Sequence, residues 1–138
     1  MTPANRLTAE ILLAVSKQFP DVKLWRNNRV DAMAVGAGGR MRRVKAGIDG
    51  QADLTGIIGG IQTGFRGCRL EIEVKAHKDR MRPSQVTFGA MIELHGGIYI
   101  EAREVEATLE ELSRYARRVR PDRDHQEPGE SFAGYTGI

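Results

Sequence analysis

The chain has 138 residues, of which 41% are hydrophobic and 28% are charged, and its net charge is +3. This length fits one compact domain, and the lack of any run of about 18 apolar residues predicts no membrane span. The single cysteine, Cys68, excludes an internal disulfide and favours a reducing cytoplasm. Residues 1–50 carry nine Lys and Arg against four acids, a balance that suits a polyanionic partner.

Helical and strand patterns alternate along the first 119 residues. Thr2 followed by Pro3 predicts a helix start, and apolar residues at helical spacing extend this helix over residues 3–18. The glycine- and arginine-rich residues 36–50 are predicted to form a flexible loop. The other predicted elements are strands at 22–26, 32–35, 53–58, 70–75 and 98–102, and helices at 83–95 and 104–119.

This element order predicts an α/β fold in which a mixed central sheet is flanked by helices. The domain is expected to cover residues 1–119. Residues 120–138 are polar and rich in glycine and proline, so they are expected to form a flexible tail.

The most informative predicted strand has the sequence LEIEVK at residues 70–75. Apolar residues alternate there with Glu71, Glu73 and Lys75, so one face is apolar and the other is charged. Two interpretations are open: an antiparallel strand with a solvated charged face, or a central strand whose charges are paired or bound to a metal. In the second case Asp53, on the preceding strand, would offer Mg²⁺ a second carboxylate beside Glu73.

Three short motifs resemble a known nuclease family. Gly50-Gln51-Ala52-Asp53, then Glu73-Val74-Lys75, then Gln85 at the start of the next predicted helix are similar to the VRR-NUC branch of the PD-(D/E)xK nucleases. The family motifs are a G-x-P-D turn, an E-x-K strand and a helix-borne glutamine, so Ala52 departs from them at the proline. The resemblance covers about residues 3–105 and implies a restriction-endonuclease-like core in the order αβββαβ.

The resemblance also implies a role for each motif residue. Asp53, Glu73 and the backbone carbonyl of Val74 would bind Mg²⁺ or Mn²⁺. Lys75 would orient or deprotonate the attacking water and neutralise charge in the transition state. Gln85 would hold that water or Lys75 from the next helix.

Five further candidate residues, all acidic or histidine, lie outside these motifs: Glu10, Glu71, His77, His95 and His125. Glu10 matches the acid on the family's first helix, which completes the metal shell through water or binds a second ion. Glu71 is expected at the surface or in a salt bridge near the sheet edge. His77, His95 and His125 show no metal-ligand spacing and are assigned no ligand role.

Basic residues around these motifs are predicted to contact DNA phosphates, although a solvated surface without a partner is the alternative. Trp25 either belongs to the core or stacks on an unpaired base. The predicted DNA contacts are Arg26, Arg29, Arg40, Arg42, Arg43, Lys45, Lys78, Arg80 and Arg82.

The function that the resemblance implies is a metal-dependent, structure-selective endodeoxyribonuclease. It would act on branched DNA such as junctions during replication, recombination or repair, in the cytoplasm of a bacterium or a phage-infected cell, as a homodimer. Two alternatives stay open: a DNA-binding module that keeps the fold without catalysis, and a restriction-type nuclease that reads a specific sequence.

Overall fold

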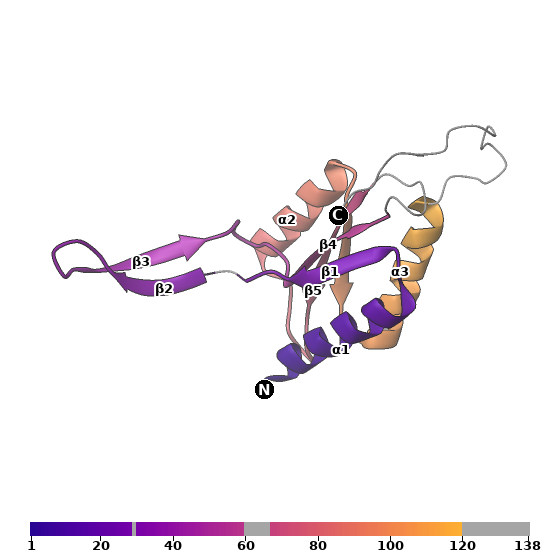
Figure 1. The fold of residues 1–138 in the computed structure, drawn as a ribbon, viewed down its shortest axis with the longest axis horizontal. Coiled ribbons are helices and arrows are strands. Elements are labelled where there is room, and N and C mark those ends of the chain that lie inside the picture. Colours follow the sequence, from indigo (N-terminus) through magenta and orange to yellow (C-terminus); the bar gives the residue numbers. More distant parts are fainter. Residues whose placement is uncertain (29, 60–66, 120–138) are drawn as a thin grey trace, which may run out of the picture.

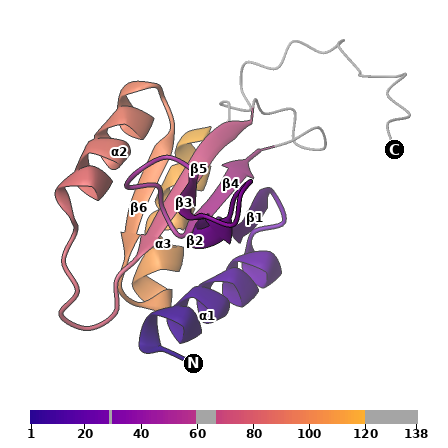
Figure 2. The ribbon, with the colours of Figure 1, turned by 90° about the vertical axis from the view of Figure 1, so that its left-hand side faces the viewer.

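The computed structural model describes residues 1–28, 30–59 and 67–119, so the predicted tail at 120–138 lies outside the described residues. Helices cover both faces of a mixed four-stranded sheet, and a separate two-stranded sheet projects from it (Figures 1 and 2). The expected α/β architecture with a mixed sheet is therefore confirmed. No helix among the described residues has the length and hydropathy to cross a membrane.

The four-stranded sheet has the order β1-β4-β5-β6. Neighbours β1 and β4, and β4 and β5, are antiparallel, whereas β5 and β6 are parallel and α2 forms the crossover between them. The strands are β1 (Val22–Arg26), β4 (Leu54–Ile58), β5 (Cys68–Val74) and β6 (Ile98–Ala102).

Helices α1 (Pro3–Gln18) and α3 (Val105–Val119) cover one face of this sheet. The start of α1 is as predicted: Pro3 is the first helical residue, and the Thr2 hydroxyl accepts a hydrogen bond from the backbone N–H of Asn5 at 3.2 Å. Both helices bury their apolar stripes against the apolar face of β5 and its neighbours. The buried core includes Ile11, Val15, Leu54, Leu70, Ile72, Ile100, Leu109 and Leu112.

Helix α2 (Pro83–Leu94) covers the opposite face of the sheet, over β5 and β6. Phe88 and Ile92 form a small apolar cluster there with Ala52, and Tyr99 of β6 packs against it. Because α2 lies over the charged side of β5, charged groups on that side are removed from water.

Strands β2 (Val30–Val35) and β3 (Met41–Ala46) pair antiparallel and extend away from the rest of the molecule (Figure 1). We call residues 30–46 the ribbon. Residues 41–46 thus form a strand, and the predicted flexible loop over 36–50 is wrong for that part. The reason is that the ribbon is exposed or half-exposed along its whole length, so its sequence lacks the apolar alternation by which strands are recognised.

Candidate functional site

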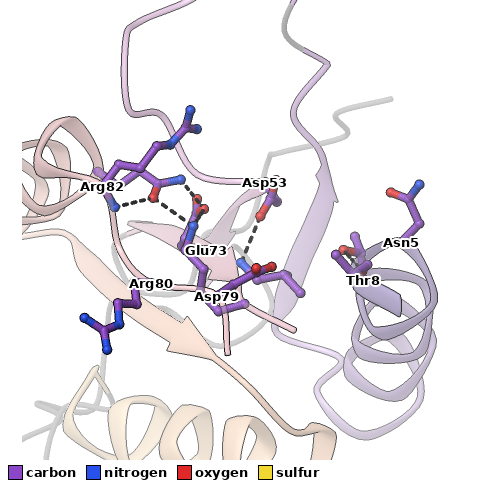
Figure 3. Close-up of a pocket in the computed structure, with 11 residues that line it drawn as sticks. Asn5, Thr8, Asp53, Glu73, Asp79, Arg80 and Arg82 are labelled. Carbon is purple, nitrogen blue, oxygen red and sulfur yellow. Dashed lines mark hydrogen bonds and ion pairs between the residues drawn. The ribbon is translucent and has the colours of Figure 1, made fainter. Parts of the chain in front are cut away.

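Two carboxylates meet where β4 begins and β5 ends. Asp53 directly precedes β4, and the pairing of Leu54 with Ile72 places it opposite Glu73 on the same face of the sheet. The Asp53 carboxylate accepts a hydrogen bond from the backbone N–H of Val74 at 2.9 Å. This bond fixes the aspartate side chain beside the glutamate (Figure 3).

A buried polar network continues from Glu73 to Lys75 and α2. Glu73 is 3% exposed and Lys75 is 7% exposed. The Lys75 ammonium lies 2.9 Å from Glu73 Oε1 and donates to Gln85 Oε1 at 2.8 Å. Gln85 closes the triangle by donating from Nε2 to Glu73 Oε1. The interpretation of this strand face as solvated is therefore wrong, because α2 covers it.

The position of Gln85 in the first turn of α2 explains its fixed orientation. Its side-chain oxygen also accepts a hydrogen bond from the backbone N–H of Arg82 at 2.9 Å, which caps the start of the helix. Networks of this kind hold their members in one arrangement when each is paired. Gln85 is thus a structural cap and a holder of Lys75 at the same time.

Glu71 lies one pair further along the same strand face and is fully buried. Its Oε1 accepts a hydrogen bond from the Thr55 hydroxyl at 2.7 Å and lies 2.7 Å from the guanidinium of Arg69. The expected surface position is therefore wrong, whereas the expected salt bridge is confirmed. The reason is again that α2, which is distant in sequence, covers this face.

Replacing Arg69 by methionine is expected to destabilise the fold by about 1–3 kcal/mol, because it leaves a buried carboxylate without its cation. Breaking a fully buried ion pair costs about 3–5 kcal/mol. We expect a smaller loss here, because about half of the Arg69 side chain is exposed to solvent. Denaturant unfolding measures the change. Arg114→Met is the control, because its partner Glu110 is exposed. Equal midpoints for the two variants would contradict the assignment.

The two carboxylates and Lys75 line an open pocket of about 340 Å³. Asn5 and Thr8 of α1 form one of its walls, and the loop before α2 forms another (Figure 3). The structure therefore brings together seven predicted site residues. They are Asp53, Glu73, Val74, Lys75, Arg80, Arg82 and Gln85.

Glu10 does not line this pocket. It is exposed and lines a separate pocket with Arg6, His77 and Arg103. Thr8 is the residue of α1 that faces the carboxylates, and Glu10 lies about 200° around the helix axis from it at 3.6 residues per turn. Glu10 therefore does not share a pocket with Asp53 and Glu73, as the binding of one metal ion by all three residues would require.

The remaining predicted DNA contacts fall in several places. Lys78 is exposed in the loop after β5 but does not line the pocket. Arg26 donates a hydrogen bond to the side chain of Asn5 at 3.3 Å, and Arg29 lies outside the described residues. The other four belong to the ribbon. Trp25 is 45% exposed, so it is not a core residue.

The sequence did not indicate four of the lining residues, which are Ala4 and the polar residues Asn5, Thr8 and Asp79. Asn5 and Thr8 are three residues apart on one face of α1, but an uncharged pair on a helix gives no signal of a site. Asp79 lies within the basic run from His77 to Arg82, which was interpreted as a DNA-binding loop. Its position after Lys75 is the signal that could have found it.

The segment that carries Asp53 is fixed on both sides. Asn27 donates two hydrogen bonds to it, from its backbone to the Asp53 carbonyl at 2.9 Å and from its amide to the Ala52 carbonyl at 3.2 Å. Gly50 has a φ of 78°, and a Cβ there would lie 2.1 Å from the carbonyl oxygen of Ser84. The glycine therefore lets the backbone before Asp53 touch the first turn of α2.

The donors in the pocket fit a hard divalent cation. Among the described residues there is no group of three His, Cys, Asp or Glu side chains arranged to hold a metal. The pocket offers the adjacent carboxylates Asp53 and Glu73, and Asp79 is a third acidic residue in its lining. Mg²⁺ binds in this way, through one or two carboxylates together with waters and substrate phosphate oxygens. Burial raises the pKa of the Tyr99 phenol, and nearby carboxylates, Glu73 foremost, raise it further. The carboxylates on this face of the sheet thus act on Tyr99, although Tyr99 does not line the pocket.

No family model, curated protein or solved structure matches the chain. The chemistry of the pocket is therefore the basis for assigning a function. Its components are two adjacent carboxylates, a buried lysine held by a glutamine, and arginines on the rim.

Proposed function

We propose that the chain is a metal-dependent endodeoxyribonuclease with a core of the PD-(D/E)xK type, similar to the VRR-NUC branch. The observation that carries the proposal is the buried network in which Gln85 holds Lys75 against Glu73, next to Asp53 at an open pocket. The order of α1, three strands of one sheet, α2 and β6 supports it, since it corresponds to the αβββαβ order of that core.

The protein ligands for Mg²⁺ or Mn²⁺ would be Asp53, Glu73 and the carbonyl of Val74. When bound, the ion would polarise a phosphate oxygen of the DNA and favour attack on phosphorus. The side chain of Asp53 is already held in one orientation, because one of its carboxylate oxygens accepts a hydrogen bond from the backbone N–H of Val74. The restraint reduces the entropy that would be lost on binding.

Lys75 would act on the attacking water. Its ammonium is a compact point charge with three donors, and Gln85 and Glu73 fix its position. It would orient the water, neutralise charge as the water oxygen bonds to phosphorus and the 3′ oxygen leaves, and assist loss of the water proton. Hydrolysis in this direction leaves a 5′-phosphate and a 3′-hydroxyl.

Arg80 and Arg82 lie on the same pocket and would bind the phosphates next to the scissile one. Branched DNA as the substrate, a homodimer as the active form, and a task in bacterial or phage DNA replication, recombination or repair belong to the same proposal. The alternative is a DNA-binding module without catalysis. Such a module would not need a lysine and a glutamate buried together at the edge of an open pocket.

Cleavage of labelled single strands, duplexes, flaps and four-way junctions with Mg²⁺ or Mn²⁺ tests the proposal, beside Asp53→Asn and an EDTA control. The wild-type chain should cut at least one substrate, and EDTA should abolish cutting. Asp53→Asn should lower the rate by about 100-fold, because the amide is a weaker ligand of similar shape. Binding without cutting under both metals would instead identify the non-catalytic module.

A further inference from the structure

The ribbon begins and ends next to the proposed catalytic aspartate. It is the connection between β1 and β4, so its first strand follows Asn27 and its second leads into Gly50 and Asp53. The two hydrogen bonds from Asn27 to residues 52 and 53 close its base. The ribbon projects from the main sheet (Figure 1). Because its base lies next to Asp53, a polymer bound with one phosphate at Asp53 lies within reach of it.

The two faces of the ribbon differ in charge. Val35 pairs with Met41 and Ala34 with Arg42, and the backbone N–H of Gly36 donates to the Arg40 carbonyl at 2.8 Å. Opposite residues share a face, so Arg40 and Arg42 lie together on one side, opposite Gly36 and Ala34. We call this side the arginine face. All ribbon residues on it are small apolar residues or arginines, and none is acidic.

The opposite face carries two cations, Arg43 and Lys45, and one acid, Asp31. Arg43 makes two hydrogen bonds to the carboxylate of Asp31, both at 2.7 Å, and the two groups stabilise each other's charged forms. The pKa of the Asp31 carboxyl is accordingly lowered. Arg43 was predicted as a DNA contact on equal terms with its neighbours, but this geometry makes it a brace between β2 and β3. The arginines that remain uncompensated are Arg40 and Arg42.

We propose that the ribbon enters a groove of duplex DNA beside the cleavage site, with Arg40 and Arg42 bound to phosphates. This inference rests on the proposed function, since that function makes DNA the polymer at Asp53. The major groove is about 12 Å wide and admits a two-stranded ribbon, and strands of six residues reach about 20 Å. The substrate would then need a double-stranded arm on the ribbon side of the scissile phosphate.

Charge favours DNA over a second copy of the chain as the occupant. The ribbon carries four cations against the single acid Asp31. Two ribbons packed on one another would bring like charges together, whereas a phosphate backbone supplies the opposite charge and releases counterions. The exposed apolar residues Val30 and Ala32 of the arginine face can contact thymine methyl groups in a groove.

Binding in EDTA, where no cleavage occurs, tests the inference. The probes are a short labelled duplex and the single strand of the same sequence, and the variants are the double substitution Arg40→Gln with Arg42→Gln and the control Arg114→Gln on α3. The double variant should raise the duplex Kd by about 10-fold or more. The plot of log Kd against log salt should become shallower by about 1.8, which corresponds to two lost phosphate contacts. The Kd for the single strand should change by no more than about two-fold.

Each contrary result has a definite meaning. An unchanged duplex Kd, or an equal loss for the single strand, overturns insertion into a duplex. A dimer in solution that becomes monomeric with Val35→Ser and Met41→Ser would assign the ribbon to contact between copies instead. If duplex affinity depends on the arginines but no substrate is cut, the ribbon inference holds and the nuclease proposal fails, so the two are distinguishable.

Discussion

Replacing Lys75 by methionine is expected to lower the rate of DNA cleavage at saturating substrate by about 10³-fold or more, the loss typical of a group that serves both proton transfer and charge stabilisation. Methionine preserves most of the apolar stem but cannot orient water or bind Gln85, which now accepts from the ammonium at 2.8 Å. DNA affinity in EDTA should change little, because Lys75 is a buried residue at the floor of the pocket.

The matched control for this variant is Lys17→Met, an exposed lysine in the last turn of α1, which should cleave at the wild-type rate. Thermal unfolding has to accompany the assay, because Glu73 stays buried in the variant without its cation. Rates are then compared at a temperature where both proteins are folded. A folded variant that retains more than about a tenth of the wild-type rate would exclude Lys75 from the chemistry.

Gly50→Ala is expected to destabilise the protein by about 2–5 kcal/mol. The left-handed backbone at φ 78° costs an L-residue about 1–2 kcal/mol, and the new Cβ would overlap the Ser84 carbonyl at 2.1 Å. This neighbour is backbone at the start of a helix, so the overlap is relieved only if α2 moves, at a further cost of about 1–3 kcal/mol. Denaturant unfolding measures the loss.

Gly96→Ala separates the two causes. Gly96 has a similar φ of 81°, but no atom lies within 4 Å of its ideal Cβ position, so only the backbone term applies, about 1–2 kcal/mol. Gly50→Ala should also lower the cleavage rate by more than the loss of folded protein at the assay temperature explains. The reason is that a shift of α2 moves Gln85, which binds Lys75. If the two alanine variants were equally stable, the contact between Gly50 and α2 would have no energetic importance.

Strand β5 of the main sheet could be predicted because apolar and charged residues alternate in its sequence. The cap at Thr2 and Pro3 located α1, and the alternation in β5 identified which residues share a face. The alternation did not reveal that the charged face of β5 is covered. The covering helix, α2, follows β5 in the sequence and packs on this face only in the folded protein. For this reason the salt bridge of Glu71 was among the expectations, but its full burial was not.

The ribbon and the contribution of α1 were harder to predict. A strand exposed on both faces carries no apolar period, and its glycines resemble those of a loop. For α1, the family resemblance implied an acid on the first helix at Glu10. Which of Thr8 and Glu10 lies at the pocket depends on how the helix is rotated against the sheet. That rotation is set by the burial of Ile11 and Val15.

The place at which the ribbon joins the sheet makes it a separable module. Strands β1 and β4 are adjacent and antiparallel, so a tight turn could connect them, and the hydrogen bonds of Asn27 already close the base. Loop-closure entropy grows only slowly with length, at about 0.6 kcal/mol for each doubling. A variant of this chain with a longer, shorter or differently charged ribbon should therefore keep the main sheet and the pocket residues in place, so that the ribbon can be changed independently of the pocket.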